Sequence, residues 1–504
     1  MTQTMKSTSP SRFFPYFLPP VIFLSVFVGC LALGPFLFNV DGDLGRHLTL
    51  GQVILARGAI PTMDEFSHTR FGDPFSPHEW IPEVIFRLFF NWQGLSGVVL
   101  FTALLLGLVF WLITYRIFRI THSTPITLIL VVIGIAASRI HWLARPHIFT
   151  YLFLVLWMEL LVSKISFRWK LALAILLMLL WVNTHGAFIL GLVVIVCFLG
   201  GYFLQRLLQH KWDEVLPEIR QFSILLGVSL VVSLINPDGI RIWQTIYGFL
   251  SSRYLVSHTA EYMPPVLYQT GVLPFTLLLV LGIICLALYW KMLQPQQVIL
   301  LVAFGVFGIL SGRNIPLFII IALPILAECF TRLLPNFKLQ LDRQNEPLSP
   351  ISDPKPFLFG FPVILSILIF VFGIVLFQFQ PALSQRNQYS PSRYPVQAVE
   401  WLEGHPQSGR MFNDFMWGGY LLFRKWPDVL VFIDGQTDFY GEALTRDYEV
   451  ISNGWDGWDR LLQEYQISWV IIPIRSPLME ELDASGIWHQ IYADPTTVIY
   501  SLNR

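Results

Sequence analysis

Cysteine is scarce in this sequence, and its placement excludes a disulfide-stabilised scaffold. The 504 residues contain 4 cysteines, and each lies in or beside a long apolar run: Cys30, Cys197, Cys285 and Cys329. No cysteine follows residue 329, so no disulfide framework supports the C-terminal part of the chain. No Cys/His spacing typical of a zinc site occurs either.

Charged residues are also few, and they cancel. Only 13% of the residues are charged, and 33 Lys and Arg balance 33 Asp and Glu. A net charge of zero argues against a nucleic-acid-binding surface. The sequence also lacks an Asn-x-Ser/Thr acceptor, an internal repeat and a low-complexity tract.

Apolar residues are in excess: they make up 54% of the chain, and the mean hydropathy is +0.59. Apolar runs of roughly 18 to 22 residues recur, each long enough to cross a bilayer. A tight turn at Arg313 favours two helices there over one re-entrant element. We therefore predict a polytopic α-helical membrane protein with about 11 spans, near 18–39, 95–115, 124–140, 148–163, 171–184, 187–206, 221–236, 272–290, 297–311, 314–333 and 357–378.

The positions of the cationic residues predict the orientation. The first span follows Lys6 and Arg12 and has no cleavage site after it, so we expect an uncleaved helix. With the N-terminus in the cytoplasm, every lysine of the membrane portion falls on the inner side, as the positive-inside rule favours. The outer loops carry arginine instead, which grips phosphate bidentately, although snorkelling at interfaces also explains some arginines. The same orientation makes 334–356 a cytoplasmic linker and puts the C-terminus outside.

The loop after the first span carries the strongest chemical signal. It opens DGDLGRH, from Asp41 to His47, and a continuing helix would place Asp43, Arg46 and His47 on one face. The alternative is an Asp-Gly turn before an ordinary helix start. The whole loop, 40–93, is long for a connector, and long ordered loops tend to be functional.

The rest of this loop has helical spacing from Trp80 onward. That spacing predicts an amphipathic helix at the membrane interface, so we expect two interfacial helices around a polar stretch. His78 and Glu79 open the second helix, where the helix dipole alone would also favour a glutamate.

Other outer loops each add single polar groups. Taken one by one, these residues have ordinary explanations as helix caps or turns. Together with seven histidines on the same side, they predict a site for an anionic substrate. The candidate substrate-binding residues are Arg46, His78, Glu79, Arg139, Arg145, His147, His185, Arg241 and Arg313.

The composition changes after residue 380, which separates a transmembrane domain (1–380) from an extracytoplasmic α/β domain (381–504). Hydrophobic runs shorten there to the length of buried strands. The order of the elements favours a partly parallel sheet. We predict strands at 410–414, 429–433 and 468–473, helices at 417–426 and 459–465, and a hairpin at 488–502.

This organisation resembles the GT-C superfamily of membrane glycosyltransferases, which includes oligosaccharyltransferases, protein mannosyltransferases and lipid A aminoarabinose transferases. The chain is most similar to a bacterial GT-C family with five short motifs. They stand here at Asp41 to His47, His78 to Trp80, Asn183 to Gly186, Trp417 to Tyr420 and Ile433 to Gly435. One departure is that Gly45 and Arg46 replace the aromatic residues expected there.

The resemblance implies an enzyme of the inner (plasma) membrane. It would move a hexosyl or pentosyl unit from a polyprenyl-phosphate or diphosphate carrier to an extracytoplasmic glycan, lipid or protein. The essential acid of the first outer loop would be Asp43, with Asp41 and His47 beside it as further catalytic candidates. Asp43 would act as a base, or Asp41, Asp43 and Glu79 would hold Mg²⁺ or Mn²⁺, which prefer oxygen ligands.

Two other classes compete with this interpretation. A transporter of lipid-linked or anionic substrates would place ionisable residues near mid-membrane, often in repeated halves, whereas here the charges gather at one surface. A non-catalytic assembly or sensor protein would bind partners through its C-terminal domain, and it would need neither the acidic loop nor the arginines.

Overall fold

The computed structural model describes residues 14–209, 212–333 and 385–502. The predicted span 357–378 and the linker 334–356 lie outside the described residues, as do Lys6 and Arg12.

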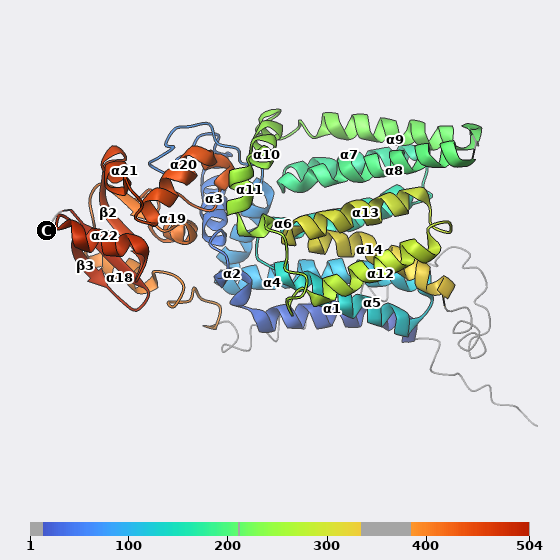
Figure 1. Cartoon of the computed structure of the whole chain (residues 1–504), viewed down its shortest axis with the longest axis horizontal. Helices are drawn as coiled ribbons and strands as arrows, with labels where there is room; N and C mark the ends of the chain where they lie inside the picture. Colours follow the sequence, from blue (N-terminus) through green and yellow to red (C-terminus); the bar gives the residue numbers. More distant parts are fainter. Residues whose placement is uncertain (1–13, 210–211, 334–384, 503–504) are drawn as a thin grey trace, which may run out of the picture.

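Apolar helices form a bundle, and the C-terminal domain lies at one end of it (Figure 1). Within the described part, 5 helices are long and apolar enough to cross a membrane: Trp80–Thr121, Thr124–His141, Gly186–Leu208, Val215–Val232 and Gly312–Thr331. Shorter apolar helices accompany them. Because side chains such as Val231 and Leu288 are each 64% exposed on the bundle, its outer surface suits lipid. These features indicate a multi-pass membrane protein, as predicted.

A helix occurs at every predicted span that the structure describes. The helices are α1 (Phe14–Leu33), α4 (Trp80–Thr121), α5 (Thr124–Ser138), α6 (His147–Val162), α7 (Phe167–Val182), α8 (Ile189–Gln209), α9 (Trp212–Val232), α12 (Leu273–Tyr289), α13 (Pro295–Leu310) and α14 (Ile315–Leu333). Two short helices between α9 and α12 were not predicted, α10 (Arg241–Ser251) and α11 (Arg253–His258).

The first loop contains the two expected helices in a different setting. After the short α2 (Phe36–Asn39) comes α3 (Leu44–Arg57), and the second helix is the start of α4, which kinks at Gln93 and Gly94. A helix resting on a bilayer would keep its polar face in water. In α3, however, the first two turns are buried, because α4 and the C-terminal domain cover them.

The C-terminal domain is built around a mixed sheet in the order β1-β2-β4-β3. β1 (Arg410–Asn413) runs parallel to β2 (Ile467–Pro473), while β3 (His489–Ala493) and β4 (Thr497–Ser501) form the predicted hairpin. The helices are α18 (Val396–Gly404), α19 (Gly418–Lys425), α20 (Thr437–Ser452), α21 (Trp458–Glu464) and α22 (Pro477–Ser485). The predicted partly parallel sheet is therefore confirmed.

The predicted strand at 429–433 is wrong. Val431, Phe432 and Ile433 are buried as expected, but the segment joins no sheet. Val431 makes one isolated bridge to Ser67, in the loop between α3 and α4, and the Phe432 N–H donates to the Asn413 side chain at 2.8 Å. The backbone of this segment therefore bonds to a loop and to an amide side chain. Because no neighbouring strand offers its backbone, the segment does not become a strand despite its apolar sequence.

Glycines let the loop after α1 and the C-terminal domain meet backbone to backbone. A Cβ at Gly45 would collide with the backbone of Gly419, and one at Gly419 would collide with that of Gly42. A Cβ at Gly435 would collide with the Asp43 carboxylate. This close approach explains why glycine, and not an aromatic residue, stands at position 45.

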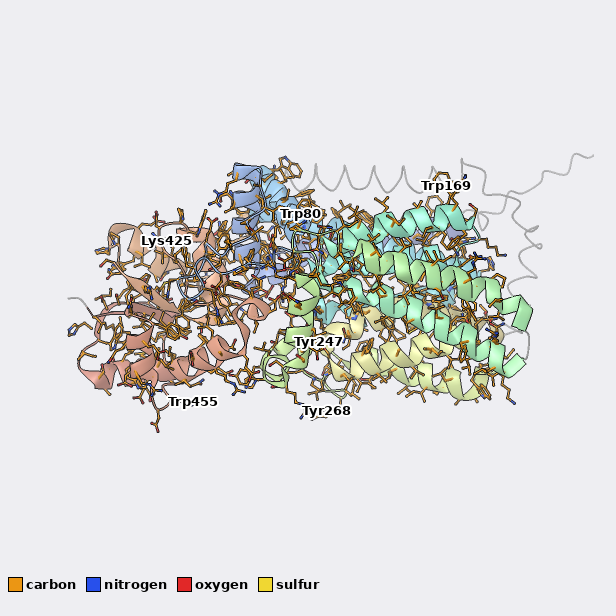
Figure 2. The ribbon with its side chains drawn as sticks, turned by 90° about the horizontal axis from the view of Figure 1, so that it is seen from above. Trp80, Trp169, Tyr247, Tyr268, Lys425 and Trp455 are labelled. Atoms are coloured by element: carbon orange, nitrogen blue, oxygen red, sulfur yellow. The ribbon has the colours of Figure 1, made fainter. Side chains whose placement is uncertain are left out.

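Aromatic side chains mark both ends of the bundle (Figure 2). Tyr247 and Tyr268 lie at the end that meets the C-terminal domain, and Trp169 lies toward the far end. All three are largely exposed, at 75%, 85% and 60%. Since Trp and Tyr collect at membrane–water interfaces, these positions fit a bilayer around the bundle.

Candidate functional site

Three carboxylates converge on one guanidinium where the bundle meets the C-terminal domain. Arg145, in the loop before α6, places its Nε 3.2 Å from an Asp41 oxygen. Its two terminal nitrogens contact Asp43 and Glu261. These side chains are 12% to 21% exposed, so a solute can still approach them.

Burial changes the acid–base behaviour of this group. It raises the pKa of Asp41 to about 7, although the Arg145 charge opposes the shift. Asp41 therefore titrates near neutral pH, where a group can both take up and release protons.

A second arginine approaches Glu261 from another loop. Arg313 lies in a 3-10 turn, η5 (Gly312–Asn314), between α13 and α14, and its Nη1 is 3.5 Å from Glu261. Its Nη2 lies 2.8 Å from His185 Nε2. Because arginine only donates, that ring nitrogen must accept, so the ring donates from Nδ1 to the Thr150 hydroxyl at 2.9 Å. Burial lowers the pKa of His185, which agrees with a neutral ring.

A largely buried cluster of His47, Glu79 and Glu83, in which the Glu79 side chain is 20% exposed, lies beside this network. Its candidate ligand atoms all fall within 4.8 Å of one another, and His47 Nδ1 is 3.3 Å from Glu83 Oε1. The other oxygen of Glu83 is buried without a hydrogen-bond partner. Burial lowers the pKa of His47 and raises that of Glu79. Neutral imidazole with two carboxylates is a donor set that fits a divalent ion, so this cluster could hold a metal.

The metal set expected from sequence fits the structure only in part. Glu79 belongs to the cluster, but Asp41 and Asp43 already share a cation, the Arg145 guanidinium. Both carboxylates therefore already have a cationic partner.

Arg46 pairs with the C-terminal domain. Its Nε lies 3.2 Å from Asp434, which is 1% exposed, and its Nη2 donates to Gln436. Burial raises the pKa of Asp434 to about 6, against the effect of Arg46. The pair joins α3 to the C-terminal domain directly behind the acidic loop.

The remaining predicted residues divide into those near the network and those apart from it. His147 packs against His141, with ring centroids 4.3 Å apart and ring planes tilted by 36°, and His78 is buried. Arg241 pairs locally with Asp238 at 2.9 Å, and Arg139 is exposed.

Sequence reasoning missed three residues of this region: Glu83, Glu261 and Asp434. Glu83 carried a signal, because it follows Glu79 by one helical turn and shares its face. Asp434 lies in the motif from Ile433 to Gly435, but its Asp-Gly pair was interpreted as a turn and not as part of the site. Glu261 stands alone in the loop after α11, with no pattern to distinguish it.

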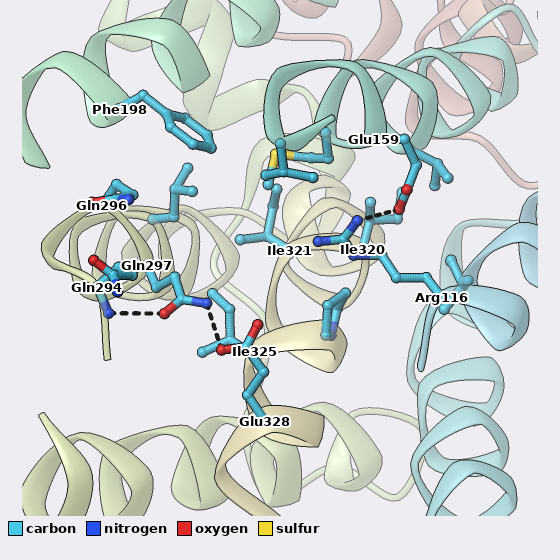
Figure 3. Close-up of a pocket in the computed structure, with 16 residues that line it drawn as sticks. Arg116, Glu159, Phe198, Gln294, Gln296, Gln297, Ile320, Ile321, Ile325 and Glu328 are labelled. Atoms are coloured by element: carbon cyan, nitrogen blue, oxygen red, sulfur yellow. Dashed lines mark hydrogen bonds and ion pairs between the residues drawn. The ribbon is translucent and has the colours of Figure 1, made fainter. Parts of the chain in front are cut away.

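A cavity of about 210 Å³ lies among α4, α6, α8, α13 and α14 (Figure 3). Its polar groups include the Arg116–Glu159 ion pair and a hydrogen bond of 2.8 Å from Gln297 to Glu328. Since Glu159 lies in the last turn of α6 and Arg145 precedes that helix, the cavity is separate from the carboxylate–arginine network.

Neither the known protein-family models nor the curated proteins contain a match to this sequence. Its fold, however, matches solved structures. The archaeal oligosaccharyltransferase AglB from Archaeoglobus fulgidus, in complex with an inhibitory peptide and a dolichol-phosphate, has a TM-score of 0.62 at 11% identity, with 92% of this chain and 70% of AglB covered. ArnT from Cupriavidus metallidurans bound to undecaprenyl phosphate has a TM-score of 0.51 at 13% identity, with 97% and 98% covered.

The Archaeoglobus fulgidus oligosaccharyltransferase in complex with Zn and sulfate matches with a TM-score of 0.56 at 11% identity, with 96% of this chain and 73% of that chain covered. At such identities the likeness concerns the fold. The chain therefore has a GT-C-like fold, as the resemblance implied.

Proposed function

We propose that this protein is a membrane glycosyltransferase that moves a sugar from a polyprenyl-phosphate or diphosphate carrier to an extracytoplasmic acceptor. The observation that carries the proposal is the convergence of Asp41, Asp43, Arg145 and Arg313, from three separate loops, at one end of a GT-C-like bundle. Structures with this fold hold dolichol-phosphate in AglB and undecaprenyl phosphate in ArnT.

The chemistry assigns opposite tasks to the acids and the arginines. The acceptor hydroxyl attacks the anomeric carbon, the bond from that carbon to the phosphate oxygen breaks, and the bond electrons leave with the carrier phosphate. Asp43 takes the hydroxyl proton as a general base. Arg145 and Arg313 stabilise the charge that grows on the phosphate, in a site of low polarity where such contacts are strong.

The proposed orientation serves this chemistry. The N-terminus is cytoplasmic and the C-terminal domain extracytoplasmic, so the network lies at the outer surface of the inner membrane. The carrier keeps its tail among lipids while its phosphate reaches the arginines.

The buried cluster is our proposed site for a divalent ion, with His47, Glu79 and Glu83 as ligands. A bound Mg²⁺ or Mn²⁺ would supply positive charge beside the phosphate site. His47 is one helical turn from Asp43, and Glu79 approaches His185 to 3.7 Å, so the cluster adjoins the network.

Removing one ligand should weaken metal binding. We expect purified protein to bind about one Mn²⁺ per chain, measured by electron paramagnetic resonance, and Glu83→Gln to weaken binding by at least about tenfold, or 1.4 kcal/mol. Asp41→Asn is the matched comparison and should bind Mn²⁺ almost as well as wild type. Equal losses of Mn²⁺ affinity in both variants would show that the ion does not bind specifically at this cluster. No Mn²⁺ binding by wild type would show that the protein has no such metal site.

Cleavage of the carrier–sugar bond is the result that separates a transferase from a transporter. In proteoliposomes supplied with radiolabelled polyprenyl-phosphate sugar and membrane acceptors, we expect the label to leave the carrier and free polyprenyl phosphate to appear. A transporter would relocate the intact donor. Intact donor after incubation with folded protein and an extract of acceptors would contradict the proposal.

A further inference from the structure

Glu261 occupies the centre of a cationic cradle. It lies in the 3-10 turn η4 (Ala260–Tyr262), between α11 and α12. One carboxylate oxygen contacts Arg145. The other lies 3.5 Å from Arg313 Nη1 and 3.8 Å from His141 Nε2. Three nitrogen-bearing side chains from two loops, the one before α6 and the one between α13 and α14, thus surround one carboxylate.

The cradle has spare hydrogen-bonding capacity. His141 Nε2 is buried and has no hydrogen-bond partner. Arg313 keeps contacts of its own, to the Tyr262 hydroxyl at 2.9 Å and to His185. An anion with more acceptor oxygens than a carboxylate would satisfy these donors better.

A phosphodiester resembles the Glu261 carboxylate in the property that this cradle recognises. Both carry one negative charge, and both present two equivalent oxygens that accept hydrogen bonds. When a sugar leaves the phosphodiester, the carrier becomes a phosphate monoester with a third such oxygen and a second ionisable charge. The cradle would therefore stabilise the departing group more than the donor, which is the condition for catalysis.

We infer that Arg145, Arg313 and His141 form the binding site for the carrier phosphate, and that Glu261 fills this site until the phosphate displaces it. The inference rests on the proposed function. It adds an internal competitor, which keeps other anions out and weakens the hold on the spent carrier.

Exchange requires the side chain of Glu261 to move and not its backbone. The Glu261 carbonyl accepts from the Ser311 hydroxyl at 2.9 Å, and the Gly312 N–H donates to the Met263 carbonyl at 3.1 Å. These bonds fix the turn to η5. A rotation of the side chain is then enough to release Nη1 of Arg145 and Nη1 of Arg313 from Glu261.

The charges determine the sign of the effect. With every group ionised, Arg145 and Arg313 face Asp41, Asp43 and Glu261, so a phosphate meets an excess of negative charge while Glu261 stays in place. Removing the Glu261 charge should therefore strengthen phosphate binding. If the carboxylate only held the loops together, its removal would weaken phosphate binding.

The test is binding of farnesyl phosphate to the full chain in nanodiscs, followed by calorimetry. Glu261→Gln should bind farnesyl phosphate about tenfold more tightly than wild type. It should also bind inorganic phosphate more tightly than wild type does, whereas its affinity for farnesol should not rise. Glu442→Gln is the matched control, because its carboxylate pairs with Arg446 on the surface, and its affinity should equal that of wild type. Adding Arg313→Gln to Glu261→Gln should abolish the gain.

Unchanged or weaker phosphate binding by folded Glu261→Gln would overturn the inference, as would an equal gain for farnesol. If Glu261→Gln fails to fold, Glu261→Asp withdraws the carboxylate by one methylene and should give a smaller gain of the same sign. If the protein cleaves the donor but Glu261→Gln shows no gain in phosphate affinity, the inference about Glu261 fails and the proposed function stands. If Glu261→Gln shows the gain but the protein cleaves no donor, the proposed transferase function fails and the anion-binding site stands.

Discussion

Asp43→Asn is expected to lower sugar transfer about 10²- to 10⁴-fold, the usual contribution of a general base, while the protein still folds. The amide is nearly isosteric and its oxygen can still accept from Arg145, so the contact between the two loops survives. Transfer from polyprenyl-phosphate sugar in proteoliposomes measures the effect, with expression and melting temperature checked for each variant.

Two comparisons make the Asp43 result specific. Asp73→Asn removes a carboxylate from the same outer loop, where it pairs with Arg70 at 3.5 Å on the surface, and should leave transfer unchanged. Asp41→Asn should cost less than Asp43→Asn if Asp41 only orients Arg145. Wild-type transfer by well-folded Asp43→Asn would remove the central residue of the mechanism and favour a non-catalytic role.

Asp434→Asn should destabilise the protein more than any surface charge change. It leaves Arg46 as an uncompensated buried cation, and breaking a buried pair in this way costs about 3–5 kcal/mol. We expect a clear drop in the melting temperature in detergent and easier proteolysis of the C-terminal domain. Glu403→Ala, which removes the 61%-exposed partner of Arg424, should cost at most about 1 kcal/mol.

A second substitution tests the cause of this loss. Adding Arg46→Met to Asp434→Asn removes the unpaired charge and should restore much of the stability, because a buried pair is often replaceable by apolar groups. Asp434 lies directly against Gly418. If the double variant is as unstable as Asp434→Asn, the loss comes from this packing and not from charge.

The membrane bundle could be predicted from sequence because each span is a local apolar run whose length alone identifies it. The same reasoning failed at 429–433, where burial was expected but the strand was not found. Whether a buried segment joins a sheet depends on its neighbours in space. Here those neighbours are Ser67 and Asn413, which are distant in sequence.

The candidate site shows the same division. The acidic loop, and the arginines on the side expected to face outward, could be identified from the residue types in the sequence. The sequence could not show which arginines converge. Arg139 and Arg241 lie in loops of the same predicted side as Arg145 and Arg313, so nothing in the sequence separates the two pairs. Only the folded loops bring the latter pair to one carboxylate, and that carboxylate, Glu261, carried no sequence signal of its own.

The position of a carrier phosphate tests the central claim most directly. A cryo-EM structure of the purified full chain with a polyprenyl phosphate should show phosphate density between Arg145 and Arg313, with Asp43 facing the position that the sugar would occupy. Lipid phosphate bound elsewhere on the protein, or a cradle still filled by Glu261 at saturating lipid, would contradict the account.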